Sequence, residues 1–222
     1  FITMSHHQKQ YLHNKWGVSL NKIHVIPISF GAAFQAKPKK PNANVIKIIS
    51  AFRMCWEKNI DGNLRTVKQL KEKGCAVQYD IYGDGPDSGQ VMYLIDKYKL
   101  SDCVTYHGKI ENTKLKEQLP QYDFFLQLSH SEALPTSVVE AQSFGVPAIV
   151  SNSDGLPEAI INDESGYCVP AHDAKTAAEY MAALWKDENK YFKFSEAAIK
   201  NSHNKFTNEC EAYALCQLYI NI

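Results

Sequence analysis

Strand-like and helix-like segments alternate along most of this chain, and their order restricts the possible folds strongly. Apolar runs such as VIKIISA (Val45–Ala51), AVQYDIYG, DFFLQLS and VPAIVS predict buried strands. Between the first two runs, residues 60–74 place Ile60, Leu64 and Val67 on one helical face. This alternation predicts an α/β fold: a doubly wound, Rossmann-like parallel sheet covered by helices on both faces. In such sheets, ligands bind at the carboxyl ends of the strands.

The two ends of the chain depart from this alternation. Residues 1–35 predict a strand, a helix and a second strand, and the lysine- and proline-rich tract after them predicts a linker over residues 36–44. We expect the Rossmann-like domain over residues 45–190 and extra C-terminal helices over residues 191–222. Because the chain begins FITMSHHQ rather than with methionine, we interpret it as a piece of a longer protein.

The composition narrows the function classes. The 222 residues include 24 basic and 24 acidic side chains, and this balance argues against a nucleic-acid partner. The six cysteines include no C-x-x-C pair and the eight histidines no H-x-x-x-H spacing, which favours reduced thiols and argues against a protein metal site. No apolar run is long enough to span a bilayer, and no signal peptide is recognisable.

The segment SEALPTSVVEAQSFGVPAIVS places two glutamates around the start of a short helix. Pro135 suits the first helical turn, and the N–H groups after it, at Thr136 and Ser137, are left unpaired. Together with the helix dipole, these groups favour an anion. Glu140 lies about 7–8 Å further along the helix axis, and Glu132 lies in the preceding loop. This layout suits a ligand with a phosphate centre and hydroxyl groups at both ends, although isolated glutamates are more often surface residues.

The segment FRMCWEKN follows the first core strand and brings two cations to the same edge of the sheet. Arg53 would contact a diphosphate through its planar fork, and Lys58 would contact it as a point charge. Alone, each is more often a surface charge beside a helix. Next to the anion-binding helix start, the two predict a clamp for a leaving diphosphate.

The segment IYGDGPDSG contains three glycines in a G-x-G-x-x-x-G pattern. As a dinucleotide fingerprint it is weak, because it follows a middle strand, Pro86 interrupts the turn, and no well-placed acidic residue follows about 20 positions on. What remains is that Gly83 allows the backbone to turn close to a ligand.

Five motifs, in their order along the chain, resemble one known family. These motifs are RMCWEK, YGDGP, VTYHGKI, YDFFLQLSHSEALPTSVVEAQSFGVPAIVS and DGLPEAI…SGYCVP. Together they resemble the C-terminal, donor-binding domain of retaining glycosyltransferases with the GT-B fold. More narrowly, they resemble the group 1 glycosyltransferases of family 4, in which seven residues separate two glutamates, as they separate Glu132 and Glu140. The resemblance covers about residues 20–172. Phe52 stands where the family usually has a glycine before its arginine.

The resemblance implies a role for each matching residue. Arg53, Lys58 and Glu132 would carry catalysis: the two cations bind the donor's diphosphate, and Glu132 lies near the transferred sugar. Glu140 would bind the ribose hydroxyl groups, and Gly83 would lie close to the nucleotide. The remaining implied contacts are the backbone around the phosphates and sugar (Ala133, Leu134, Thr136 and Ser137) and a turn that holds the base (His107, Lys109 and Ile110).

The implied activity is hexosyl transfer, with retention, from a UDP- or GDP-type sugar to a saccharide or lipid-linked acceptor in polysaccharide biosynthesis. The resemblance implies neither a metal nor another cofactor. The acceptor would be bound by the protein's own N-terminal domain. Residues 1–35 would be a remnant of that domain and of the hinge, residues 36–44 would form the interdomain linker, and the helices over residues 191–222 would pack toward the same domain. We therefore expect the chain alone to bind nucleotides but to transfer sugar poorly or not at all. A cytoplasmic location is expected, and peripheral association of the full-length protein with the inner membrane face is compatible with it. Two alternatives stay open: another GT-B activity, such as a nucleotide-sugar epimerase, and a non-catalytic Rossmann-like binding domain.

Overall fold

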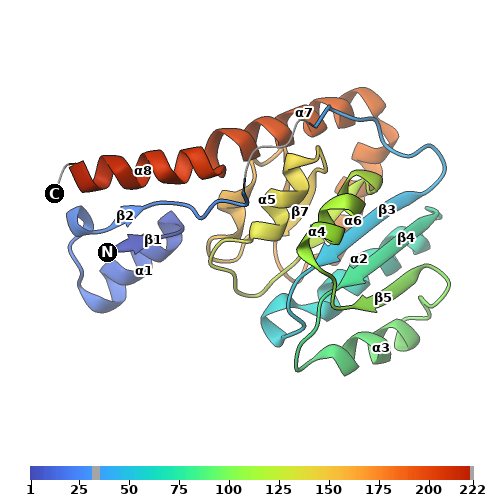
Figure 1. Cartoon of the computed structure of the whole chain (residues 1–222). Coiled ribbons are helices and arrows are strands. Elements are labelled where there is room, and N and C mark those ends of the chain that lie inside the picture. Colours follow the sequence, from blue (N-terminus) through green and yellow to red (C-terminus); the bar gives the residue numbers. More distant parts are fainter. Residues whose placement is uncertain (32–35, 221–222) are drawn as a thin grey trace.

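Six parallel strands form the central sheet of this protein. The structure, a computed structural model, describes residues 1–31 and 36–220. The strand order is β5-β4-β3-β6-β7-β8, and every neighbouring pair is parallel. Figure 1 shows the sheet with helices packed around it. The strands are β3 (Ile46–Ala51), β4 (Val77–Tyr82), β5 (Val104–Gly108), β6 (Phe124–Gln127), β7 (Ala148–Ser151) and β8 (Gly166–Val169).

The sheet is buried on both faces, which explains why its strands are almost continuously apolar. Along β3, Ile46 and Ile48 belong to one hydrophobic cluster, whereas Ile49 and Ala51 belong to another. All four residues of β6 and all four of β7 are buried. The predicted doubly wound, Rossmann-like parallel sheet is therefore confirmed.

Helices cover the two faces. The first cluster takes its helical side chains mainly from α2, α3 and α6, and the second takes them from α4 and α5. The helix predicted from the spacing within residues 60–74 is α2. The helices around the sheet are α2 (Ile60–Glu72), α3 (Ser88–Lys97), α4 (Asn112–Gln118), α5 (Thr136–Ser143), α6 (Ala174–Lys186) and α7 (Glu188–Lys205), with short 3-10 turns η2 (Trp56–Lys58), η3 (Leu119–Gln121) and η4 (Leu156–Ala159).

The sheet has a switch point between β3 and β6. From β3 the chain adds β4 and β5 on one side, and from β6 it adds β7 and β8 on the other. The connections after these two central strands therefore diverge and leave a crevice at their carboxyl ends, where open α/β sheets bind ligands. Arg53 and Lys58 follow β3, and Glu132 follows β6.

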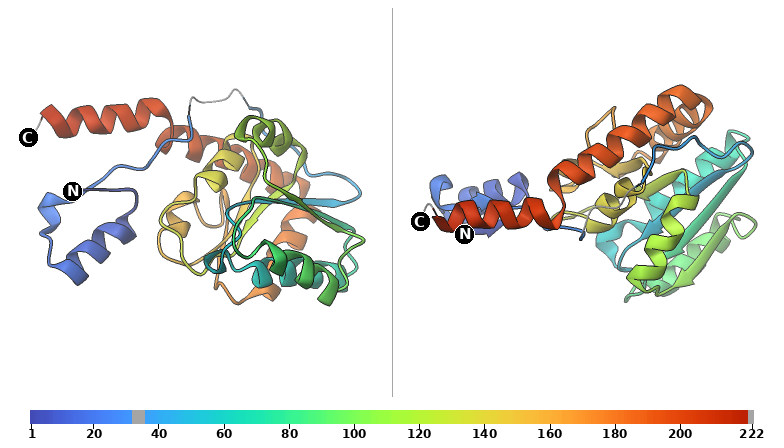
Figure 2. Two further views of the ribbon diagram at one scale, coloured as in Figure 1. Left: turned by 60° about the horizontal axis from the view of Figure 1, so that its bottom comes forward. Right: turned by 45° about the horizontal axis from the view of Figure 1, so that its top comes forward.

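The N-terminal segment forms a small unit beside the main sheet. Strand β1 (Ile2–Thr3) pairs in parallel with β2 (His24–Val25), and between them lie α1 (His6–Trp16) and the 3-10 turn η1 (Leu20–Lys22). The last helix, α8 (Asn208–Ile220), extends beyond the sheet domain and runs alongside this unit (Figures 1 and 2). The predicted strand, helix and strand are all found.

Helix α7 packs on the sheet domain. The Ser195 hydroxyl donates to the Gly145 carbonyl at 2.7 Å, and the Asn201 amide donates to Gln142 at 3.1 Å. Small and amide side chains of α7 fit against α5, whereas α8 runs alongside the N-terminal unit. The expectation that the helices from residue 191 onward also pack toward an N-terminal domain stays a prediction.

Residues 36–44 contain neither helix nor strand. Two backbone groups fix them to the sheet domain: the Lys39 N–H donates to Ser195 Oγ at 3.0 Å, and the Asn42 N–H donates to Asp123 Oδ1 at 2.8 Å. The predicted boundary at residue 35 lies outside the described residues. An interdomain hinge over residues 36–44 remains a prediction.

Candidate functional site

A cavity of about 280 Å³ opens at the crevice, between the ends of β3 and β4 and the start of α5. It brings together seven of the predicted site residues, which come from three separate loops, after β3, β4 and β5, and from α5. It is lined by Ala51, Phe52, Arg53, Tyr82, Gly83, Asp84, Lys109, Ile110, Asn112, Leu115, Thr136, Ser137 and Glu140.

The start of α5 presents backbone N–H groups to this cavity. The helix begins at Thr136, directly after Pro135, whose extended backbone ends the loop. No side chain caps this helix, and its first turn contains no acidic residue. The first N–H groups, at Thr136 and Ser137, are therefore placed to bind an anion, as the sequence predicts.

Glu140 lies one turn further along α5 and lines the cavity with a buried carboxylate. Its side chain accepts hydrogen bonds from the Asn112 amide at 3.2 and 3.3 Å, and the Lys116 ammonium lies 3.9 Å away. Burial raises the pKa of this carboxyl, and these two neighbours partly oppose the rise. The sequence gives no indication of the Asn112 contact, because Asn112 lies 28 positions away at the start of α4.

The raised pKa of Glu140 predicts that Glu140→Gln stabilises the fold at neutral pH. Between the ordinary carboxyl pKa and the raised one, the folded state binds more protons than the unfolded state, so wild-type stability falls as pH rises through this window. Glutamine has no charge to bury. Thermal melts from pH 4 to pH 8 should show a higher Tm for the variant at pH 7 and a difference that shrinks toward acid. A difference that grows toward acid would contradict this assignment.

Lys58 and Glu132 are paired with each other rather than placed in the cavity. The Lys58 ammonium forms an ion pair with Glu132 Oε2, which also accepts from the Gln127 amide at 2.8 Å. Both charged side chains are only 15% exposed. The sequence predicts Arg53 and Lys58 as one clamp, but the two cations face different surroundings: Arg53 lines the cavity, whereas Lys58 bridges the β3 and β6 loops.

Two residues that sequence analysis did not single out hold the Glu132 loop. Asp154 Oδ2 accepts from the Ser131 hydroxyl at 2.5 Å and from the Glu132 N–H at 3.2 Å. The Gly155 N–H donates to the Glu132 carbonyl at 2.9 Å, and a Cβ at Gly155 would overlap the Ala133 carbonyl oxygen. The signal for both is the SDGLPE turn, which the sequence offers only as part of the family resemblance.

Besides Lys58 and Glu132, three further predicted residues lie outside the cavity lining. His107 Nε2 lies 2.6 Å from Asp80 Oδ1, and its ring stacks on Tyr82 at 4.5 Å between centroids. These contacts engage the His107 ring, which belongs to the turn predicted to hold the base. Ala133 packs its carbonyl against the Gly155 backbone, and Leu134 is buried in the second hydrophobic cluster. Of the predicted HGKI turn, Lys109 and Ile110 line the cavity.

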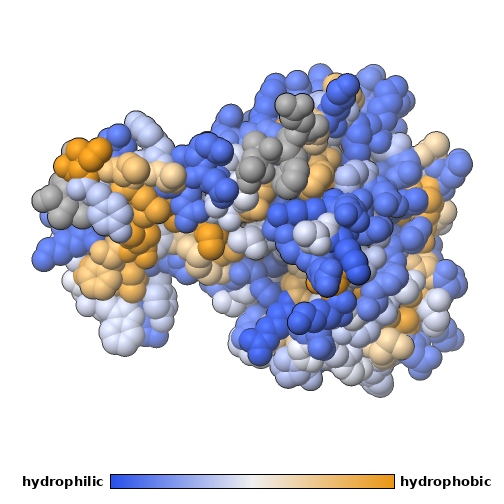
Figure 3. All heavy atoms as spheres, in the orientation of Figure 1, coloured by the Kyte–Doolittle hydropathy of each residue, from blue (hydrophilic) through white to orange (hydrophobic). Residues whose placement is uncertain are grey.

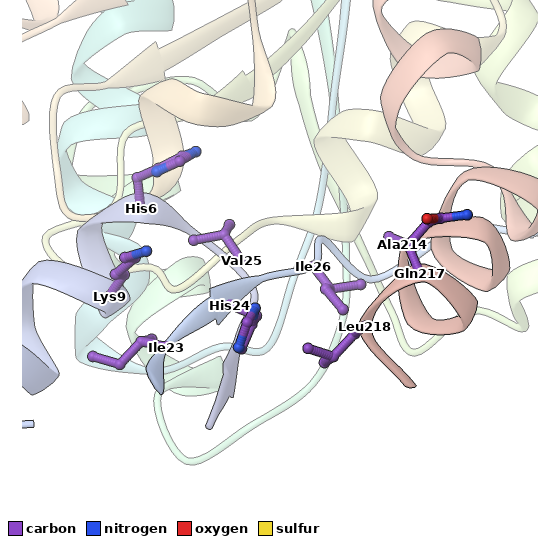
Figure 4. A pocket seen from close by; sticks show the side chains of 9 residues that line it. All are labelled: His6, Lys9, Ile23, His24, Val25, Ile26, Ala214, Gln217 and Leu218. Atoms are coloured by element: carbon purple, nitrogen blue, oxygen red, sulfur yellow. The ribbon is translucent and has the colours of Figure 1, made fainter. Parts of the chain in front are cut away.

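A larger cavity, of about 470 Å³, lies away from the strand ends. It separates the N-terminal unit from α8, with His6 and Lys9 on α1, His24 on β2, and Gln217 and Leu218 on α8 (Figure 4). It contains none of the predicted site residues, so we place the candidate site at the smaller cavity.

A family model described as "Glycosyl transferases group 1" matches residues 32–201. The chain belongs to this family. It is 33% identical over 157 residues to the putative colanic acid biosynthesis glycosyltransferase WcaL of Escherichia coli K12, covering 68% of this chain and 39% of that protein. It is 26% identical over 177 residues to the amylovoran biosynthesis glycosyltransferase AmsK of Erwinia amylovora, covering 77% of this chain and 42% of that one. The chain therefore spans less than half the length of these curated group 1 relatives.

Solved structures confirm the GT-B half fold. A Staphylococcus aureus TarM mutant, crystallised with Fondaparinux, alpha-GlcNAc-glycerol and UDP, superposes with a TM-score of 0.85 at 20% identity, covering 98% of this chain and 43% of that one. The pneumococcal O-GlcNAc transferase GtfA, in complex with UDP and GlcNAc, superposes with a TM-score of 0.76 at 22% identity, covering 99% of this chain and 44% of that one. At these identities the likeness establishes the fold.

Two further findings concern the described part of the chain. Over residues 1–31 and 36–220, no helix is both long enough and apolar enough to cross a bilayer. Over the same ranges, no three His, Cys, Asp or Glu side chains are grouped so that they could hold a metal ion. A cytoplasmic location and metal-independent chemistry remain predictions.

Proposed function

We propose that this chain is the donor-binding part of a retaining glycosyltransferase, which transfers a hexosyl group from a nucleotide-diphosphate sugar to a saccharide or lipid-linked acceptor. The observation that carries this proposal is one cavity in which Arg53, the uncapped start of α5 and the buried carboxylate of Glu140 meet. Membership of the group 1 family supports transfer over epimerisation or a non-catalytic binding role.

The cavity residues match the parts of such a donor. The diphosphate lies between the Arg53 guanidinium and the N–H groups of Thr136 and Ser137, where both fixed charge and the helix dipole favour an anion. The ribose hydroxyl groups donate to Glu140, whose carboxylate accepts only weak, long hydrogen bonds from Asn112. The base lies toward Ile110.

Charge separation during transfer explains the roles that we propose for Arg53, Lys58 and Glu132. Breaking the sugar–phosphate bond leaves negative charge on the diphosphate, and Arg53 and the α5 amides are preorganised to stabilise it without a metal. The sugar becomes oxocarbenium-like beside Glu132, whose carboxylate is held by Lys58 and Gln127. Retention would follow from attack of the acceptor on the face that the diphosphate leaves.

An N-terminal acceptor domain would complete the enzyme. Figure 3 shows apolar side chains gathered over the N-terminal unit and the end of α8. Phe1, Ile2, Tyr219 and Ile220 are each at least half exposed there, and exposed apolar patches of this kind mark contact surfaces. This surface supports a domain that packs on β1 and α8. We therefore expect the chain alone to bind nucleotides without measurable transfer.

Nucleotide binding by the 222-residue chain tests the proposal. TarM was crystallised with UDP, so UDP is the first nucleotide to titrate by calorimetry, followed by GDP. Glu140→Gln should weaken binding about tenfold or more, because it removes the charge from hydrogen bonds to the ribose. Glu117→Gln, on the exposed side of α4 outside the cavity, is the matched control. Equal affinities for wild type and Glu140→Gln would show that the ribose lies elsewhere.

A further inference from the structure

A third cavity, of about 350 Å³, lies at the same end of the sheet as the donor cavity and shares no lining residue with it. Its lining includes the aromatic residues Trp56 and His130, Asn59 and Asp61 at the start of α2, and Gln90 on α3. Asp87 and Ile60 complete the lining. Because the two linings are separate, this cavity and the donor cavity can hold different ligands at the same time.

The Trp56 side chain is exposed and lies on a turn whose backbone is hydrogen-bonded. It is 66% exposed, and it stacks on the His130 ring with 6.5 Å between centroids and 25° between planes. The backbone beneath it is fixed, because the His130 N–H donates to the Glu57 carbonyl at 2.7 Å and the Asn59 N–H donates to the Trp56 carbonyl at 3.1 Å. A large aromatic ring that is open to solvent offers a flat apolar face to a ligand.

The polar groups of this cavity fit a neutral, hydroxyl-rich ligand. Two carboxylates, of Asp61 and Asp87, line it together with the Gln90 amide, and its lining contains no lysine or arginine. In the part of the chain that the structure describes, no hydrogen bond or ion pair engages the side chains of Asp87 and Gln90. Carboxylates repel phosphate groups but accept hydrogen bonds from sugar hydroxyls. The lining therefore disfavours a second nucleotide and favours a saccharide, whose C–H face packs on an aromatic ring.

The cavity also shares two loops with the proposed point of transfer. Trp56 lies two residues before Lys58, and His130 lies two residues before Glu132, so the loops that form the Lys58–Glu132 pair also carry these two aromatic residues. A sugar on Trp56 would thus be held beside the carboxylate at which the donor sugar is released.

We propose that the Trp56–His130 cavity is a saccharide subsite, which holds part of the acceptor's sugar chain on the donor-binding domain. This inference rests on the proposed function for the identity of the acceptor. The sugar ring stacks on Trp56, and its hydroxyl groups donate to Asp87 and bond to Gln90. The subsite extends acceptor recognition beyond an N-terminal domain. It would bind the sugar chain of the acceptor rather than a lipid attached to it.

Binding of neutral tetrasaccharides to the 222-residue chain tests the subsite. Maltotetraose, cellotetraose and the N-acetylglucosamine tetramer are titrated to millimolar concentrations while the three tryptophan indole N–H signals are followed by NMR. At least one probe should shift the Trp56 signal, and Trp56→Ala should weaken its binding about tenfold or more. Trp16→Ala is the matched control, because Trp16 is 67% exposed at the end of α1 and lines neither cavity; it should bind as wild type.

The outcomes separate this inference from the proposed function. If no probe shifts the Trp56 signal, or if Trp56→Ala binds as tightly as wild type, the subsite is overturned, whatever UDP does. A shift of the Trp56 signal by UDP alone also overturns it. Saccharide binding that is lost in Trp56→Ala supports the subsite even if calorimetry detects neither UDP nor GDP, and only the transferase proposal then fails.

Discussion

Arg53→Ala is expected to lower the rate of glycosyl transfer by about 100- to 1000-fold in the intact enzyme that contains this chain. Arg53 lies on the loop after β3, lines the donor cavity, and is exposed, so its removal costs little packing. The loss is one preorganised positive charge at the place where the departing diphosphate gains negative charge. Because that charge develops in the transition state, kcat should fall more than KM rises.

Two variants sharpen this test. Arg65→Ala removes the only other arginine of the sequence and should leave transfer unchanged. The Arg65 side chain is exposed on α2 and lies 3.9 Å from Asp61. Arg53→Lys keeps the charge but loses the planar fork, so its rate should fall between those of wild type and Arg53→Ala. Steady-state rates with the UDP- or GDP-sugar measure all three. A rise in KM with unchanged kcat would mean that Arg53 binds the donor without stabilising the departing diphosphate.

Gly83→Ala is expected to lower the free energy of unfolding by about 3 kcal/mol or more. Gly83 has a φ of 129°, a backbone conformation that side chains strongly disfavour. A Cβ there would overlap the Phe52 carbonyl oxygen, and the Met54 side chain lies 3.1 Å from the same point. The backbone cannot move aside easily, because the Gly83 N–H donates to the Gly108 carbonyl at 2.8 Å.

Gly89→Ala is the control for this substitution. Gly89 lies in the first turn of α3, and a Cβ there would meet nothing within 4 Å. Alanine should raise the free energy of unfolding by up to about 1 kcal/mol, because it restricts the unfolded chain and favours a helix. Urea unfolding followed by circular dichroism compares the three proteins. A midpoint for Gly83→Ala equal to that of wild type would contradict the close approach of the two strand-end loops.

The close approach of the Phe52 carbonyl to Gly83 also explains how Phe52 is accommodated where the family usually has a glycine. The Phe52 side chain packs at the edge of the first hydrophobic cluster, and its N–H donates to the Tyr82 carbonyl at 3.2 Å. The tight contact is made by its backbone carbonyl, which any residue has. The glycine that this contact requires is Gly83, on the neighbouring strand.

Much of the fold could be predicted from the sequence, because its signals are local. The apolar run of β3 needs only a chain buried on both faces, and the spacing of Ile60, Leu64 and Val67 needs only a helix with one buried side. The start of α5 can also be predicted locally, because Pro135 restricts its own backbone and that of its neighbours. These features led to the parallel sheet, its ligand-binding edge and the anion-binding helix start.

The pairing of the site residues was decided by the tertiary structure. The sequence places Glu132 and Lys58 at one edge of the sheet, but their ion pair joins residues 74 positions apart and depends on how two loops fold against each other. In the same way, Asp80 and Tyr82 occupy the ring of His107, and Asn112 contacts Glu140 across the cavity. Sequence spacing determines which face or edge a residue occupies, whereas the partner of its side chain depends on distances of a few ångströms that only the packed chain fixes.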